Sequence, residues 1–128
     1  SRTLHLVLSG QSLSFRVRQL WPVGIPANHS MYEPNVNRIL DSLSPTDVVL
    51  DIGGWARPFN RANFVMDAEP YETRGYYGAL VPAQGGDKEF FDKSTWIVRD
   101  ICERTPYPFK DKELDFVICS HTLEDIRD

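Results

Sequence analysis

The sequence has 128 residues, of which 41% are hydrophobic, 12% aromatic and 25% charged. This is the length of one domain, with enough apolar surface for a buried core, and it excludes a two-domain enzyme, a disordered chain and a low-complexity repeat. No apolar run approaches the roughly 18 residues of a membrane-spanning helix, and no secretory signal pattern opens the chain. We therefore predict a cytoplasmic protein with no membrane partner.

Charge and cysteine content exclude further classes. The net charge is −4, yet residues 1–30 contain three arginines and no acidic residue, so the remainder has a net charge of −7. An acidic chain of this kind repels phosphates, and we predict no nucleic-acid partner. Two cysteines, Cys102 and Cys119, are too few for a disulfide framework or a zinc knuckle. A reducing compartment is predicted.

The N-terminal segment alternates between apolar and polar side chains. From Thr3 to Arg18 the period is two, which predicts a β-hairpin that turns at Ser9-Gly10-Gln11. Pro22 and Pro26 then prevent a strand or helix from continuing. Residues 1–30 are predicted to form a β-hairpin and a linker.

A helix follows the linker. Its apolar residues recur with helical spacing and form one face. The helix is predicted to begin at Ser30 or Glu33 and to end at Ser44-Pro45. The apolar residues are Val36, Ile39, Leu40 and Leu43. Such a helix needs a sheet on which to bury its apolar face.

Short continuous apolar runs predict that sheet. Runs of this kind are typical of strands buried on both faces of a parallel sheet. They lie at Val48–Ile52, Phe64–Met66, Trp96–Val98 and Phe116–Cys119. Because a parallel crossover needs about a dozen residues, we expect a helix of a turn or two between the first two strands. Another short helix is expected near Asp87–Lys93.

Chemistry-bearing residues follow the first two of these strands. Asp51-Ile52-Gly53-Gly54 ends the first strand in glycines, which permit positive φ and close approach of a ligand. The second strand ends in Asp67, whose carboxylate is suited to accept both hydroxyls of a ribose. These features by themselves fit NAD and other adenosyl ligands equally.

The third and fourth strands favour one family. Asp100-Ile101 follows the third strand, and Tyr107-Pro108-Phe109 precedes a fourth strand that ends in Ser120-His121. With the earlier motifs, this order resembles the class I S-adenosylmethionine-dependent methyltransferases, of the type 11-like kind, over roughly Val48 to Asp128. The resemblance implies an α/β, Rossmann-like methyltransferase fold. It implies a partial parallel sheet of strand order 3-2-1-4, with residues 31–128 as the cofactor-binding half.

The resemblance also implies roles for single residues. The glycine loop would face the methionine part of the cofactor, the next acid would bind the ribose, and the third strand end would border the adenine. The implied S-adenosyl-L-methionine residues are Asp51, Gly53, Gly54, Asp67, Asp100, Ile101 and Ser120. No catalytic residue is assigned, His121 being a weak candidate for a general base. The histidines have no metal-ligand spacing, so no metal site is predicted.

Two departures from the family pattern bear on this site. Trp55 replaces the second loop glycine, and Arg57 and Pro58 stand where the family has a small residue and a helix start. Trp55 therefore limits backbone approach to a cofactor. Tyr71, Tyr76 and Tyr77 are interpreted either as a lid over the adenosine or as anchors of a long loop.

The chain contains no counterpart of the family's strands five to seven. The fourth strand, Phe116–Cys119, is then expected to be an exposed edge that promotes self-association. The predicted function is methyl transfer to an unidentified small-molecule acceptor by an incomplete enzyme. The alternative, favoured by Trp55, is a non-catalytic methyltransferase-like binding or interaction module. NAD chemistry is disfavoured because the remaining glycines of GxGxxG are missing and Asp100-Ile101 has no role there.

Overall fold

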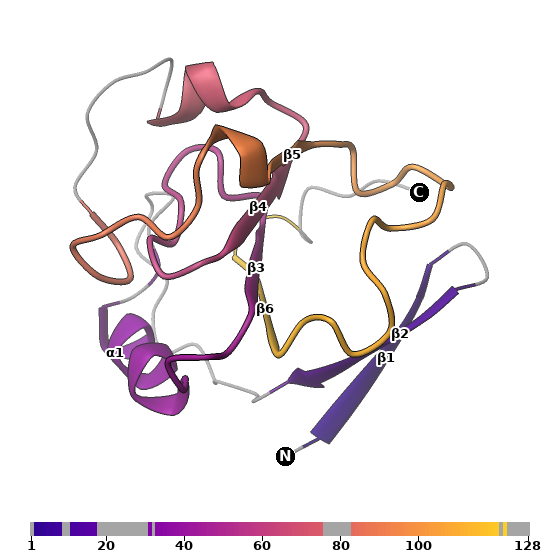
Figure 1. Cartoon of the computed structure of the whole chain (residues 1–128), viewed down its shortest axis with the longest axis horizontal. Helices are drawn as coiled ribbons and strands as arrows, with labels where there is room; N and C mark the ends of the chain where they lie inside the picture. Colours follow the sequence, from indigo (N-terminus) through magenta and orange to yellow (C-terminus); the bar gives the residue numbers. More distant parts are fainter. Residues whose placement is uncertain are drawn as a thin grey trace.

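The computed structural model describes residues 2–8, 11–17, 31, 33–75, 83–120 and 122. Within these ranges it has an α/β architecture of a four-stranded parallel sheet, one α-helix and a separate antiparallel hairpin (Figure 1). None of the helices in these ranges has the length and apolar character needed to cross a membrane.

The N-terminal hairpin is confirmed. Strand β1 (Arg2–Leu8) pairs antiparallel with β2 (Gln11–Val17), with Leu8 opposite Gln11. Gln11, which the sequence predicts to be part of the turn, therefore belongs to the second strand. The linker over residues 18–30 lies outside the described residues.

The predicted parallel sheet is also confirmed. It consists of β3 (Val49–Ile52), β4 (Phe64–Asp67), β5 (Trp96–Val98) and β6 (Phe116–Cys119). The spatial order is β5-β4-β3-β6 and every pair is parallel. Counted along the chain, this is the predicted order 3-2-1-4. The carboxyl ends of all four strands therefore meet at one edge.

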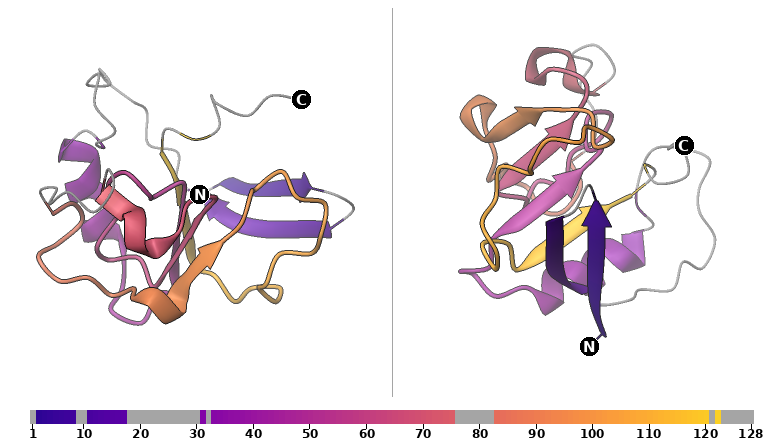
Figure 2. Two further views of the ribbon diagram at one scale, coloured as in Figure 1. Left: turned by 90° about the horizontal axis from the view of Figure 1, so that it is seen from above. Right: turned by 90° about the vertical axis from the view of Figure 1, so that its right-hand side faces the viewer.

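The helix α1 (Glu33–Ser42) covers one face of this sheet (Figure 1). Its predicted apolar side packs onto the sheet and the loop after β3, because Ile39 is buried against Val49, Phe59 and Ile118. On the other face, Leu50 and Met66 are buried. The hairpin and the chain between β5 and β6 lie on that side (Figure 2). Phe109 from this chain meets Phe64 edge to face at 5.2 Å.

The prediction of a short helix between β3 and β4, and of another near Asp87–Lys93, is wrong. Between β3 and β4 the chain forms turns and bends, because Pro58 has no amide donor and the amides that follow bond across the loop. Asn63 N, for example, donates to Val49 O. Residues 87–92 are not helical either; the one-turn 3₁₀ helix η2 (Lys93–Thr95) begins only at the last residue of the expected range, and the other described 3₁₀ helix is η1 (Tyr71–Thr73).

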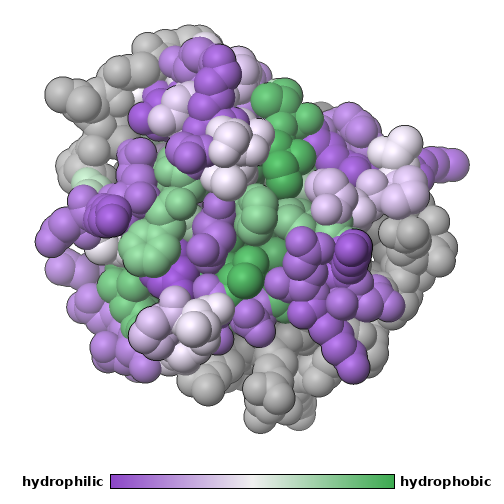
Figure 3. Space-filling view, in the orientation of Figure 1, coloured by the Kyte–Doolittle hydropathy of each residue, from purple (hydrophilic) through white to green (hydrophobic). Residues whose placement is uncertain are grey.

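The two edges of the sheet differ in their surroundings. Strand β6 is an edge strand as predicted, and β2 lies beside it without joining the sheet. Self-association through β6 stays a prediction. At the opposite edge, Val98 at the end of β5 is 59% exposed. On the face seen in Figure 3, hydrophobic residues form a broken band between polar regions.

Candidate functional site

A small pocket lies at the carboxyl ends of β3 and β6. Its walls include four of the predicted residues, namely Asp51, Gly53, Gly54 and Ser120. They are completed by Met31, Ala56, Arg57, Gln84 and Ile118. The other three predicted residues, Asp67, Asp100 and Ile101, belong to the ends of β4 and β5 and are not part of these walls. The predicted set is thus divided between a pocket and the adjoining edge.

The size of the pocket limits what it can hold. The cavity has a volume of about 30 Å³, which is room for roughly two water molecules. A nucleoside is far larger than this. The pocket therefore suits a small polar or charged group, and a larger ligand would have to extend from it along the sheet edge.

Asp51 is the buried acid of the pocket. The residue belongs to β3 and is only 4% exposed. Its Oδ2 accepts a hydrogen bond from Phe59 N at 2.8 Å. Burial raises the pKa of Asp51 to about 7; the Phe59 amide opposes this shift and the negative charge of Asp67 adds to it. Near neutral pH this carboxyl is therefore divided between its protonated and ionised forms.

The two glycines after β3 are required by the packing of the chain itself. Gly53 has φ +77°, and a Cβ there would overlap Thr122 Oγ1. A Cβ on Gly54 would lie 2.5 Å from Asp51 Oδ2. We had explained these glycines by close approach of a ligand. The observed contacts instead bring the loop against the β6 exit and over the Asp51 carboxylate.

Asp67 connects the glycine loop to the end of β4. Oδ2 accepts from Trp55 N at 3.0 Å and Oδ1 accepts from Glu69 N at 2.9 Å. Each carboxylate oxygen has two lone pairs, so both oxygens are able to accept a further donor. The predicted ribose acid is therefore oriented by the backbone before any ligand is considered.

Trp55 has a structural role that sequence reasoning missed. Its Nε1 donates to Thr73 Oγ1 at 3.0 Å, and Gly75 N donates to Trp55 O at 2.8 Å. The ring packs against a buried cluster of Val65, Phe91 and Trp96. Trp55 thus joins the loop after β3 to η1, and it is not part of the pocket wall. Its aromatic character was the only available signal.

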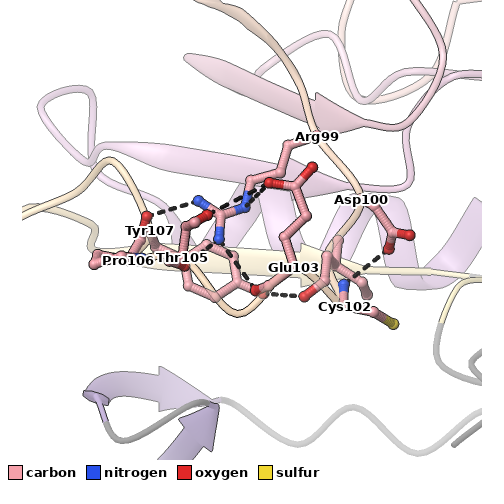
Figure 4. Close-up of polar contacts among 8 residues, drawn as sticks. Arg99, Asp100, Cys102, Glu103, Thr105, Pro106 and Tyr107 are labelled. Atoms are coloured by element: carbon pink, nitrogen blue, oxygen red, sulfur yellow. Dashed lines mark hydrogen bonds and ion pairs between the residues drawn. The ribbon is translucent and has the colours of Figure 1, made fainter.

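Arg99 organises the loop after β5. The residue is 8% exposed, and its guanidinium donates to the carbonyl oxygens of Pro106 at 2.7 Å, Glu103 at 3.3 Å and Thr105 (Figure 4). It also lies 4.5 Å above the ring of Tyr107. These contacts wrap residues 100–107 around a single buried cation.

The two predicted adenine-edge residues belong to this wrapped loop. Tyr107 Oη donates to Ile101 O at 2.9 Å, and Asp100 Oδ1 accepts from Cys102 N at 2.8 Å (Figure 4). Asp100 is exposed and Ile101 half-buried. The loop conformation that presents both residues is therefore determined by Arg99 and Tyr107, for which we had predicted no role.

Gln84 joins three segments of the pocket wall. It is 7% exposed; its Oε1 accepts from Met31 N at 2.8 Å and its Nε2 donates to Arg57 O at 2.9 Å. Its backbone oxygen accepts from Asn60 N at 2.7 Å. Sequence reasoning missed Gln84, because nothing local distinguishes a glutamine that bonds to partners far along the chain.

The remaining candidates are divided by what the structure describes. His121, Tyr76 and Tyr77 lie outside the described residues, while Tyr71 packs against Trp96 with ring centroids 5.6 Å apart. Tyr71 is thus an anchor of its segment. In the described part of the chain, no group of three or more His, Cys, Asp or Glu side chains is arranged to hold a metal ion.

The chain was compared with known proteins. No family model, curated protein or solved structure matches it. A function has therefore to be inferred from the sheet edge and its pocket.

Proposed function

We propose that the chain binds S-adenosylmethionine and forms the cofactor half of a class I, Rossmann-like methyltransferase. The observation that supports this best is the strand order β5-β4-β3-β6 with all strands parallel. Along the edge of the sheet, this order places Asp100-Ile101 first, Asp67 next, and then Asp51 with the two glycines. An extended adenosyl ligand has its adenine, ribose and amino-acid parts in that same order.

The edge residues have chemistry that fits the adenosine part. Asp67 accepts the ribose hydroxyls with the lone pairs that its bonds to Trp55 N and Glu69 N leave over. Asp100, an exposed carboxylate, accepts from the exocyclic amine of the adenine. Ile101 borders the ring and is fixed through its carbonyl by Tyr107.

The pocket has chemistry that fits the amino-acid part. Its volume of about 30 Å³ suits a charged group of a few atoms. Asp51 and Ser120 belong to the walls, and both are able to accept hydrogen bonds from an ammonium group. The pocket lies between β3 and β6, where the strand order reverses, which is where open α/β sheets bind ligands.

The chain's contribution to the reaction is positioning. When bound, S-adenosylmethionine supplies a methyl group whose carbon forms a bond to the acceptor's lone pair as the C–S bond breaks and its electrons pass to sulfur. Asp67 would hold the ribose and the pocket would hold the amino-acid part, so the sulfur that lies between these two parts of the ligand would be held in one position for an acceptor. The proposed acceptor is a small molecule.

The proposal is tested by calorimetric titration of the chain with S-adenosylmethionine, its demethylated product S-adenosylhomocysteine, and NAD. Binding of the two adenosyl sulfur compounds without binding of NAD is the expected result. Binding of NAD with no response to the sulfur compounds would overturn the assignment.

The non-catalytic binding module is the second candidate, and two observations favour it. The pocket is small, and two amides of the glycine loop are already bonded within the chain, Gly53 N to Met66 O and Trp55 N to Asp67. A module of this kind would keep the fold, with or without affinity for the adenosyl ligand, and would transfer no methyl group. Methyl transfer by the chain to any acceptor would exclude it.

A further inference from the structure

Arg99 joins the two strand ends to which the adenosine part is assigned. Its backbone N donates to Asp67 O at 2.7 Å, so the end of β5 is bonded to the end of β4, where the proposed ribose acid stands. We propose that Arg99 is a positioning residue that makes this edge selective for adenine over 6-oxo purines, because it fixes Asp100 relative to Asp67. The inference rests on the proposed function and concerns the nucleobase that the edge accepts.

The side chain of Arg99 fixes the loop that follows it. The guanidinium donates to three carbonyl oxygens within residues 103–106 and lies 4.5 Å above the ring of Tyr107 (Figure 4). Tyr107 Oη in turn donates to Ile101 O at 2.9 Å. Asp100 therefore lies between two fixed points, the strand end at Arg99 and the Ile101 carbonyl.

The orientation of the Asp100 side chain is set within the same loop. The residue is exposed, and its Oδ1 accepts from Cys102 N at 2.8 Å. Carboxylate oxygens accept hydrogen bonds, and the 6-amino group of adenine donates one. The 6-oxo group of hypoxanthine is itself an acceptor, so opposite a fixed carboxylate it stays unpaired. A carboxylate held in place distinguishes the two bases, whereas one that turns away from the ligand does not.

The contacts of the buried guanidinium are not arranged for stability alone. Arg99 is 8% exposed, and in the part of the chain that the structure describes its Nε has no hydrogen-bond acceptor, Glu103 Oε2 being 3.9 Å away. A buried donor without an acceptor lowers stability, which calls for an explanation besides holding the loop. The position of Arg99 directly before Asp100 favours recognition of the base as that explanation.

Arg61 provides a matched control at the other end of the sheet. It precedes β4, is also 8% exposed, and lies 4.6 Å above the ring of Phe90. Its guanidinium donates to the carbonyl oxygens of Ser44 at 3.1 Å and Asp47 at 2.9 Å. The two arginines thus make the same kinds of contact, but Arg61 is remote from the carboxyl edge.

Two ligands that differ only in the base test the inference. S-adenosylhomocysteine has the 6-amino group, and S-inosylhomocysteine has a 6-oxo group in its place. Both are titrated calorimetrically, and the ratio of their dissociation constants measures the selectivity. A variant that only lowers the folded fraction does not change this ratio, and thermal unfolding is followed in parallel. The proteins are the wild type, Arg99→Lys, Tyr107→Phe, Asp100→Asn and the control Arg61→Lys.

We expect the wild type to prefer the adenine ligand by about tenfold to hundredfold, the effect of one hydrogen bond to a charged group. Arg99→Lys should bring the ratio close to one, because a lysine lacks the planar fork that reaches several carbonyl oxygens. Asp100→Asn should do the same, since an amide both donates and accepts. Tyr107→Phe should lower the ratio in part. Arg61→Lys should lower thermal stability and leave the ratio unchanged.

The remaining outcomes separate this inference from the proposed function. A wild-type ratio in Arg99→Lys, or an equal fall of the ratio in Arg61→Lys, would give Arg99 a structural role only and overturn the inference. If Arg99→Lys fails to fold, an unchanged ratio in Tyr107→Phe has the same meaning. A wild type that binds both ligands equally also overturns the inference, and each of these results leaves the proposed function standing. A wild type that binds neither ligand overturns both.

Discussion

The amide of Phe59 donates to Asp51 Oδ2 at 2.8 Å, across the loop that links β3 to β4. This bond joins the buried acid of the pocket to a ring that is itself fully buried in the core under α1. Because Phe59 N bonds to the Asp51 side chain, this part of the loop packs over the carboxyl group and does not form a helix. The protonation of Asp51 and the stability of the fold are consequently linked.

The first prediction concerns this linkage. The pKa of Asp51 is raised from 3.8 to about 7, first by burial, so the folded chain binds a proton that the unfolded chain has released between these two values. Stability from this group is present below pH 4 and is lost as the pH rises toward 7, at no more than about 1.4 kcal/mol per pH unit.

Replacement of Asp51 isolates this contribution. Urea unfolding between pH 5 and pH 8 should show a free energy that declines with pH more steeply in the wild type than in Asp51→Asn, which keeps an oxygen acceptor for Phe59 N. Asp87→Asn, in an exposed loop, is the control and should retain the wild-type slope. Equal slopes in the wild type and Asp51→Asn would contradict the prediction.

The second prediction concerns the proposed ribose acid. Asp67→Asn keeps an oxygen for the Trp55 amide but removes the charge, so the affinity for S-adenosylhomocysteine should fall by about 1.5–3 kcal/mol, the range for a charged hydrogen bond. His121→Ala should weaken the same ligand less. Calorimetric titration measures both, and an equal or larger loss in the histidine variant would mean that the ribose lies elsewhere.

The third prediction concerns the loop after β5. Tyr107→Phe removes the hydroxyl that donates to Ile101 O at 2.9 Å and should lower the free energy of unfolding by about 0.5–1.5 kcal/mol. Arg99→Lys loses the fork that reaches three carbonyl oxygens and should cost more. Urea denaturation provides both values. A lysine variant as stable as the wild type would show that the buried guanidinium does not organise this loop.

The fourth prediction concerns turnover. The 128 residues should bind the adenosyl ligand without appreciable methyl transfer, because an acceptor has to be held about 3–3.5 Å from the methyl carbon by walls that exclude water. The pocket encloses only about 30 Å³. A radiolabelled methyl donor and a broad acceptor panel, applied to the 128-residue chain, measure the turnover.

Size-exclusion chromatography of the same samples reports on the predicted self-association through Phe116–Cys119. Robust turnover by a monomeric 128-residue chain would contradict the fourth prediction, since the half-sheet would then be a complete enzyme.

The regular elements could be predicted because their signals are local. Continuous apolar runs identify β3 to β6, and the helical spacing that ends in Leu43 identifies α1 and its buried side. The order of the parallel strands was correct as well, but it came from a family resemblance. Asp51, near the end of β3, and Asp67, the last residue of β4, could be assigned to one edge because the strands were predicted to be parallel.

The remaining features depend on contacts between segments far apart in the chain. Gln84 bonds to Met31, 53 residues away in sequence, and no local pattern distinguishes it from an exposed glutamine. Arg99 follows an edge strand whose last residue is exposed, yet carbonyl groups from the next loop bury it.

Asp51 illustrates the division most clearly. The sequence by itself determined that an acid stands in the first parallel strand before two glycines. Only the tertiary structure decided that this acid is buried under the Phe59 amide and shares a pocket with Arg57. The physical reason is that burial and charge are set by the atoms packed around a group, and those atoms come from segments whose approach local propensity does not encode.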